Sequence, residues 1–459
     1  MSHKLLYIST AIVTLLLFFL FTSDDAQASA IVNPNQVYTY EIMQQDLQRL
    51  EERYPDLISV EVIGTTAYGR NIYAVSVGKG LSTSYINGSN HAREWISTNL
   101  TMDMIDQYAR AYSSNSSIGR YHVRQVLDHH KIWFVPMMNP DGVTLQQRGL
   151  EAFPSANHAS IIRMNGGSRD FKRWKANARG VDLNRQFNAG WTTIPNDPGF
   201  PSHENHRGTA PHSELETQAV IRLTERVRPE MAVSYHSSGQ ILFWHYNQRG
   251  AQLSRDRVHA RAISLLTGYR LMGQHGSYSG GGYTDWFINT YKKPAFTPEL
   301  APYVGNTHVP LSLYPAIWNQ NREVGLYVAQ QSHNTYLNRL RQTVRPANLT
   351  INNVPYTAQP GAVVLDGRTL VPVRGVVENL GATVDWDQAS RTATIYGDGV
   401  TMKLPLYQTN VDVNGERATI DSPVNMIDNR TMVPIRFVSE LLGADVHWEQ
   451  STSTVIITN

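Results

Sequence analysis

Two side chains of types that bind transition metals, His91 and Glu94, lie three residues apart in the segment Asn90–Trp95. An apolar stretch, Ser84–Gly88, precedes the segment and predicts a strand that leads into a loop. A catalytic zinc site uses three protein ligands and leaves one position for water. His236, which follows the apolar segment Met231–Tyr235, completes a set of two histidines and one glutamate. The alternative is that both histidines are ordinary polar residues at strand ends.

A hydrolytic metal site also needs a base and positive charge near the reacting carbonyl. Glu299, in the segment Pro294–Leu300, is the best candidate for the base, and its alternative is a surface carboxylate at a strand end. The chain also contains a cluster of cations, Lys172, Arg173, Lys175, Arg179 and Arg185. This cluster is either a solvated face or a carboxylate-binding pocket, in which Arg185 makes a two-pronged contact. Asp182 is suited to orient a ligand histidine through its second nitrogen.

The elements around these residues predict an α/β domain built on a mainly parallel or mixed sheet. Strands are expected at Val60–Ile63, Ile72–Val77, Ser84–Gly88, Lys131–Pro136, Met231–Tyr235 and Pro294–Leu300, and helices at 42–54, 98–112, 254–266 and, largely, 311–340. A further helix begins near Ser213, with Glu216 completing a capping box. The segment 147–211 is expected to be irregular, and loops of that length are often functional. His91, Glu94, His236 and Glu299 all fall at strand ends, where α/β sheets bind ligands.

Composition narrows the class of protein. The chain has 459 residues, enough for more than one domain, and its 40 Lys and Arg nearly balance 38 Asp and Glu. Nothing in this balance indicates a nucleic-acid partner. Cysteine is absent, which excludes disulfides and thiolate zinc ligands.

The N-terminus has the pattern of a secretory signal. Lys4 precedes the apolar run Leu5–Phe21, and two small-x-small cleavage sites follow, at Ala26–Ala28 and Ala28–Ala30. The alternative is an uncleaved membrane anchor. We expect a signal peptide at 1–30, a catalytic domain at 31–345, and a protein that is secreted or associated with the cell wall.

The C-terminal region, 346–459, contains an internal duplication. Arg368–Arg374 recurs as Arg430–Arg436, and Leu380–Trp386 recurs as Leu442–Trp448, both 62 residues further on. Each unit is predicted to form a strand, a short helix and a hairpin, so this region is expected to be a small duplicated α+β module. It contains no catalytic cluster.

From about Tyr38 to Leu340 these motifs resemble the zinc metallocarboxypeptidases, the carboxypeptidase A-like family. The segments that carry the resemblance are His91–Trp95, Asn139–Gly142, Gly180–Arg185, Ser234–Ser237 and Thr297–Leu300. The resemblance implies that Zn²⁺ is bound by His91, Glu94 and His236, that Glu299 is the base and that Asp182 orients the first histidine. It also implies that Arg93 lines the substrate channel, that Asn184 and Arg185 hold the terminal carboxylate, and that Tyr278 closes over the substrate.

One departure from the animal enzymes is Lys175, which replaces the arginine that polarises the scissile carbonyl. In this respect the chain is similar to bacterial γ-D-glutamyl-L-diamino acid peptidases. The specificity pocket is expected to be polar, with no evident buried acid, and to be lined by Phe243, Asn247, Ser277, Tyr283, Thr284 and Thr297. A zwitterionic side chain such as that of diaminopimelate fits this set.

The C-terminal repeats resemble the copper amine oxidase N-terminal-like module, a stalk domain of secreted bacterial proteins, although they contain no copper ligand set. The resemblance implies attachment to the cell wall or spacing from it, and the alternative is a dimerising or stabilising module. We therefore expect a secreted zinc carboxypeptidase that cleaves peptidoglycan stem peptides between γ-D-glutamate and the diamino acid. The alternatives are a nutrient-scavenging carboxypeptidase and an inactive wall-binding protein.

Overall fold

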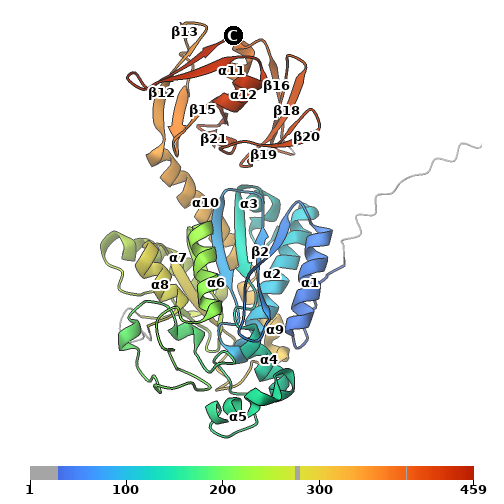
Figure 1. The fold of residues 1–459 in the computed structure, drawn as a ribbon, viewed down its shortest axis with the longest axis vertical. Coiled ribbons are helices and arrows are strands. Elements are labelled where there is room, and N and C mark those ends of the chain that lie inside the picture. The colour runs from blue at the N-terminus through green and yellow to red at the C-terminus, as the bar shows by residue number, and fades with distance from the viewer. Residues whose placement is uncertain (1–28, 274–279, 389) are drawn as a thin grey trace, which may run out of the picture.

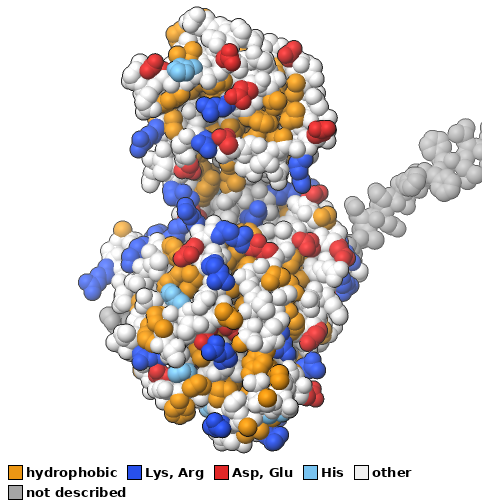
Figure 2. Space-filling view, viewed as in Figure 1, with side chains coloured by type: hydrophobic (Ala, Val, Ile, Leu, Met, Phe, Trp, Pro, Cys, Tyr) orange, Lys and Arg blue, Asp and Glu red, His pale blue; other side chains and the backbone are white. Residues whose placement is uncertain are grey.

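The computed structural model describes residues 29–273, 280–388 and 390–459, which form two lobes joined at a narrow waist (Figures 1 and 2). The larger lobe is N-terminal and the smaller one contains the duplicated region. Lys and Arg side chains gather around the waist (Figure 2). Residues 1–28 of the predicted signal peptide, 1–30, lie outside the described residues. Among the described helices, none combines the length and the apolar character needed to cross a membrane.

A mixed nine-stranded sheet forms the centre of the larger lobe, as the sequence predicted. Its order is β1-β2-β6-β3-β7-β11-β9-β10, and β8 pairs with β11. The strands are β1 (Ile58–Thr65), β2 (Asn71–Val77), β3 (Ser82–Asn87), β6 (His130–Val135), β7 (Met231–Ser234), β8 (His236–Ser237), β9 (Ile241–Phe243), β10 (Arg270–Leu271) and β11 (Ala295–Leu300). The neighbours β6, β3, β7 and β11 run parallel, so their carboxyl ends meet at one edge.

Helices pack against both faces of this sheet (Figure 1). They are α1 (Tyr40–Arg53), α2 (Ile96–Ser113), α3 (Val123–His129), α4 (Pro140–Arg148), α5 (Ser155–Met164), α6 (Leu215–Val227), α7 (Gly250–Thr267), α8 (Tyr283–Tyr291), α9 (Tyr314–Asn321) and α10 (Val324–Thr343). A small ribbon of β4 (Ser117–Ile118) and β5 (Tyr121–His122) precedes α3. The central strands are buried on both faces, which explains their nearly continuous apolar sequence.

Two local predictions were wrong. The segment 147–211 is not irregular throughout, because it contains α5, whose only buried side chain is Ile161. A helix that buries so little leaves a weak apolar period in the sequence. The capping box is also absent: α6 begins at Leu215, and Ser213 Oγ donates to Gln186 and Glu214 instead of capping the helix.

The smaller lobe has two sheets and its own apolar core. The first sheet contains β12 (Arg345–Ile351), β13 (Val354–Pro355), β14 (Ala362–Leu365), β15 (Arg368–Pro372), β21 (Asn425–Ile427), β22 (Arg430–Pro434), β23 (Asp445–Glu449) and β24 (Thr454–Thr458). The second contains β16 (Thr383–Asp387), β17 (Thr392–Gly397), β18 (Val400–Pro405), β19 (Asn410–Val413) and β20 (Glu416–Thr419). The helices are α11 (Val373–Asn379) and α12 (Ile435–Leu441).

The duplication is visible in this lobe as two strand–helix–hairpin units. The first is β15-α11-β16-β17 and the second is β22-α12-β23-β24. Strands β15 and β22 pair antiparallel, with Val371 opposite Val433, so the corresponding strands of the two repeats meet in one sheet. The predicted order of elements within each repeat is therefore confirmed.

Candidate metal centre and substrate pocket

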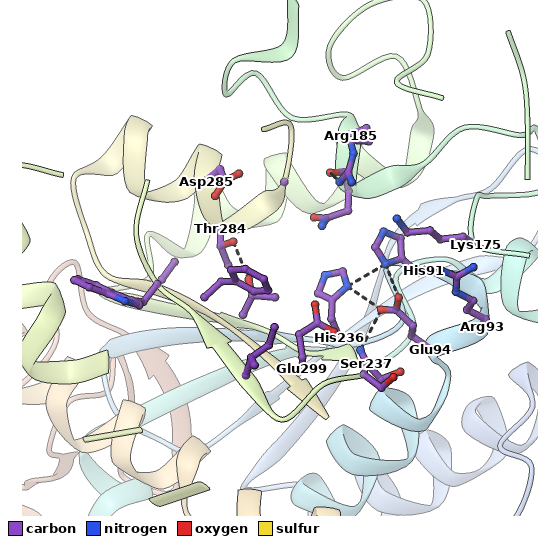
Figure 3. Close-up of a pocket in the computed structure, with 18 of the residues that line it drawn as sticks. His91, Arg93, Glu94, Lys175, Arg185, His236, Ser237, Thr284, Asp285 and Glu299 are labelled. Atoms are coloured by element: carbon purple, nitrogen blue, oxygen red, sulfur yellow. Dashed lines mark hydrogen bonds and ion pairs between the residues drawn. The ribbon is translucent and has the colours of Figure 1, made fainter. Parts of the chain in front are cut away.

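The three residues predicted as metal ligands lie together at the carboxyl ends of β3 and β7 (Figure 3). His91 Nδ1 lies 2.8 Å from Glu94 Oε1 and 3.1 Å from His236 Nδ1, and the other oxygen of Glu94 lies 2.8 Å from His236 Nδ1. His91 directly precedes a 3₁₀ turn at Ala92–Glu94, and Glu94 is the last residue of that turn, which follows β3 at this edge of the sheet. All three side chains are buried.

The second nitrogen of each histidine has a neighbour of its own. His91 Nε2 lies 3.0 Å from Asp182 Oδ1, and His236 Nε2 lies 3.2 Å from the Asn90 side-chain amide. These contacts fix both rings so that their Nδ1 atoms face the same point. Asp182 was predicted for this position, whereas the part of Asn90 was not recognised in the sequence.

This donor set fits zinc. Ligand atoms at 2.0–2.1 Å from a common tetrahedral ion lie about 3.3 Å from one another, close to the spacing found here. Burial alone would raise the pKa of Glu94, but the two histidines outweigh it and hold that pKa well below its usual range. Within the described residues, no other group of three such side chains converges in this way.

Glu299 lies beside the three ligands, on β11, in register with His236 of β8. Its side chain points into the same cavity (Figure 3). Burial and the nearby Glu94 raise the pKa of Glu299 to about 7. A carboxylate with a pKa near neutrality is well suited to accept and return a proton.

Two cations line the cavity close to the ligands. Lys175 Nζ lies 3.2 Å from Asp182 Oδ2, so Asp182 links the lysine to His91. The backbone carbonyl of Lys175 accepts a hydrogen bond from Ala92 N (3.0 Å), which ties the long loop to the ligand turn. Arg93 donates to the carbonyl of Arg173 and lies 3.5 Å from Glu204.

Asn184 and Arg185 also line the cavity, in the turn that follows Asp182. Gly281 packs against this turn with φ +68°, and a Cβ on it would lie 2.8 Å from Arg185 Cα. The absence of a side chain on Gly281 therefore lets the backbone before α8 lie close to the backbone of Arg185. Tyr278, the predicted closing tyrosine, lies outside the described residues.

The cavity next to the ligands has a volume of about 380 Å³. Phe243, Thr284 and Thr297 line it as predicted, and the hydroxyls of the two threonines are 2.9 Å apart. The prediction was wrong for Tyr283, which is completely buried against Tyr85 and Phe187, with its hydroxyl 3.2 Å from that of Thr224. It was also wrong for Asn247, an exposed residue that does not line the cavity, while Ser277 lies outside the described residues.

One acidic residue of the cavity was missed. Asp285 lines it from the first turn of α8, although the sequence suggested no buried acid in this pocket. The motif Thr284-Asp285-Trp286 gives no local sign of which of the three side chains faces the cavity.

These features together define a metallopeptidase: an α/β domain with a mixed sheet, a centre of two histidines and one glutamate, an adjacent carboxylate and a cationic pocket. A family model described as zinc carboxypeptidase matches residues 43–308. The chain belongs to the zinc carboxypeptidase family: it is a metallocarboxypeptidase, a peptide hydrolase that uses Zn²⁺. A second model, described as copper amine oxidase N-terminal domain, matches residues 350–457.

Individual proteins agree with this assignment. The chain is 31% identical over 303 residues to γ-D-glutamyl-L-diamino acid endopeptidase 1 of Lysinibacillus sphaericus, a match covering 65% of this chain and 73% of that protein. It is 27% identical over 281 residues to carboxypeptidase B of Rattus norvegicus, covering 57% and 62%. Among solved structures, thrombin-activatable fibrinolysis inhibitor has the same fold over 68% of this chain and 79% of that one, with a TM-score of 0.55 and 20% identity.

Proposed function

We propose that this enzyme cleaves cell-wall stem peptides at the bond between γ-D-glutamate and the diamino acid. The observation that carries the proposal is the similarity to γ-D-glutamyl-L-diamino acid endopeptidase 1, which extends over 73% of that protein. Lys175 and the polar threonine pair in the pocket are consistent with it. Secretion is part of the proposal and rests on the charged and apolar pattern of the first 30 residues.

The proposed mechanism divides the work among the residues of the site. Zinc held by His91, Glu94 and His236 would polarise the peptide carbonyl and make water easier to deprotonate. Glu299 accepts a proton from the attacking water as the new carbon–oxygen bond forms. It then gives the proton to the leaving nitrogen as the carbon–nitrogen bond breaks. Lys175 places positive charge beside the carbonyl oxygen, where negative charge develops.

In the proposal, two arginines that line the cavity, Arg185 and Arg93, orient the substrate. Arg185 forms no ion pair with any described residue, and its one described hydrogen bond goes to the carbonyl of Asn184. In the proposal it binds the terminal carboxylate of the substrate together with Asn184. Arg93 borders the same channel.

Identifying which bond the enzyme cleaves in a defined stem peptide tests this function. We expect the purified zinc enzyme to release diaminopimelate from L-Ala-γ-D-Glu-diaminopimelate, which mass spectrometry of the products detects. Hydrolysis of standard α-linked peptides alone would overturn the proposal and support a nutrient-scavenging carboxypeptidase. Absence of hydrolysis with both substrates, at full zinc occupancy, would support an inactive wall-binding protein, against which the intact ligand set and Glu299 argue.

The smaller lobe is proposed to attach the enzyme to the cell wall. The family model that matches this lobe is described as copper amine oxidase N-terminal domain, and the resemblance of its repeats to a stalk module motivates the proposal. The lobe also has its own apolar core. Co-sedimentation of the full chain with purified peptidoglycan is the test. If binding persists when excess soluble stem peptide occupies the catalytic site, a second wall-binding surface is present. Loss of all binding under that competition would support a spacer or dimerising module.

A further inference from the structure

Near the N-terminus the backbone lies against a buried carboxylate of α2, Asp106. Asp106 Oδ2 accepts hydrogen bonds from the backbone N–H groups of Ile31 (2.8 Å) and Val32 (3.0 Å). The side chain of Asp106 is completely buried, yet its other oxygen, Oδ1, has no hydrogen-bond partner among the described residues. Buried polar atoms are normally hydrogen-bonded, so Asp106 has room for a donor with more N–H groups than a single amide.

The charge of Asp106 is also incompletely compensated. Burial raises the pKa of Asp106, and the two amide hydrogen bonds and the positive charges of Arg110 and Arg53 oppose this shift only in part. The two arginines donate elsewhere, to the side chain of Gln107 and to the carbonyl of Ser29. Because a buried carboxylate is costly to ionise without a cationic partner, a positive charge at the position of Ile31 N would be stabilised here.

The exposure of the chain changes abruptly at the same point. Ala30 is exposed, whereas Ile31 and Val32 are 5% and 3% exposed and belong to the apolar core of the larger lobe. The chain that follows is fixed to the same helix, because Asn99 of α2 donates to two backbone carbonyls of the segment 34–36. The packed part of the larger lobe therefore begins at Ile31.

This boundary coincides with one of the two predicted cleavage sites. Ala28 and Ala30 form a small-x-small pattern after the apolar run, and cleavage there makes Ile31 the first residue. Hydrolysis of the Ala30–Ile31 peptide bond leaves a carboxylate on Ala30 and an amine on Ile31. An α-amine has a pKa of about 7.7–8.0, so it binds a proton at neutral pH and becomes an ammonium.

We propose that the processed chain begins at Ile31 and that its α-ammonium forms a buried ion pair with Asp106. The charged nitrogen lies at the position of Ile31 N, 2.8 Å from Oδ2, and brings further N–H groups for Oδ1. Removal of the leader thus completes the packing of α2, and the precursor lacks this pair. The inference rests on the secretion included in the proposed function and is independent of the substrate.

The position of cleavage is tested on the exported protein. The complete sequence is expressed in a secreting bacterial host, and intact mass and N-terminal sequencing identify the first residue of the exported chain, which should be Ile31. An exported chain that begins at Ser29, or that keeps its leader, overturns the inference. If the chain is not exported, the proposed secretion fails, and the comparison of purified proteins that follows decides whether the ion pair forms.

Proteins that begin at Ile31 and at Ser29, each released from a fusion without added residues, separate the ion pair from packing. The Ile31 protein should have a Tm about 2–5 °C higher, because hydrogen bonds to charged groups are the stronger ones. Asp106→Asn, which keeps the shape of the side chain, should abolish this difference, and the exposed control Asp56→Asn should preserve it.

Equal Tm values for the two wild-type proteins, or a difference that persists in Asp106→Asn, overturn the inference. If Asp106→Asn does not fold, the reactivity of the α-amine replaces it. An acylating reagent at neutral pH should modify the α-amine of the Ile31 protein at least about tenfold more slowly than that of the Ser29 protein, because a buried, ion-paired ammonium is protected. Equal rates of modification count against the pair with Asp106.

Discussion

Replacing Asp182 with asparagine should weaken zinc binding without removing a ligand. Asp182 is completely buried, with Oδ1 3.0 Å from His91 Nε2 and Oδ2 3.2 Å from Lys175 Nζ. Burial alone would raise the pKa of Asp182, but Lys175, His91 and Arg185 outweigh it and keep that pKa well below the usual range. The asparagine has the same shape and can still accept from the backbone N–H of Asn184.

The expected loss follows from the contact to His91. Residues that hold a metal-bound histidine typically contribute 10–100-fold to metal affinity or activity, so we expect zinc to bind about 10–100-fold more weakly in Asp182→Asn. This corresponds to roughly 1.4–2.7 kcal/mol, at about 1.4 kcal/mol for each tenfold. Competition with a chromophoric chelator measures the zinc affinity directly, and thermal unfolding with and without zinc shows whether the fold is retained.

A second variant separates orientation of the histidine from loss of stability. Asp182→Asn leaves Lys175 without its carboxylate partner, and breaking a buried pair in this way destabilises a protein. In Lys175→Met/Asp182→Asn the unpaired cation is removed as well, so Tm should recover while zinc affinity stays low. If zinc affinity recovers together with Tm, or if Asp182→Asn binds zinc as tightly as wild type, the orienting contact to His91 is not what Asp182 contributes.

Other changes test the base, the ligands and a buried acid outside the site. Glu299→Gln should lower kcat by about 10²–10⁴-fold with normal zinc content, and unchanged hydrolysis would exclude Glu299 as the base. His236→Ala should not retain stoichiometric zinc after dialysis, and a chelator should abolish wild-type activity until zinc is restored; activity in zinc-free enzyme would contradict the metal mechanism. Burial, with Glu214 and Asp141 nearby, raises the pKa of Glu216 from 4.5 to about 8. Because the folded-state pKa is raised, wild-type stability should fall as pH rises from about 4.5 to about 8. At pH 8.5 Glu216→Gln should therefore be more stable than wild type by a few kcal/mol and unfold at a higher temperature. At pH 4.5 the variant and wild type should unfold at the same temperature. A stabilisation of equal size at both pH values would refute this reasoning.

The ligand set was predictable because its signals are local. His91 and Glu94 are three residues apart, and the 3₁₀ turn between them keeps both at one strand end. His236 and Glu299 each follow a short apolar strand, and parallel strands bring such ends to one edge. The mixed sheet and the repeat elements were predictable for the same reason, since periodicity and duplication are visible in the sequence alone.

Asp285 and Tyr283 show where this reasoning stops. Both lie in the first turn of α8, yet Tyr283 is buried in an aromatic cluster while Asp285 lines the cavity. Which of them faces the substrate depends on how α8 packs against β7 and β11, and that packing involves residues distant in sequence.

The polarity of the central sheet also separates the candidate metal centre from the smaller lobe. The candidate metal ligands and Glu299 lie at the carboxyl ends of β3, β7 and β11, whereas the smaller lobe packs at the opposite ends (Figure 1). There Arg391 of the smaller lobe donates to His129 (2.9 Å to Nδ1), which directly precedes β6, and Ser82 at the start of β3 lies 3.2 Å from His333 of α10. Because parallel strands place their carboxyl ends on one edge, a lobe attached at the amino ends lies away from the cavity. Among the described residues that line the cavity, none belongs to the smaller lobe.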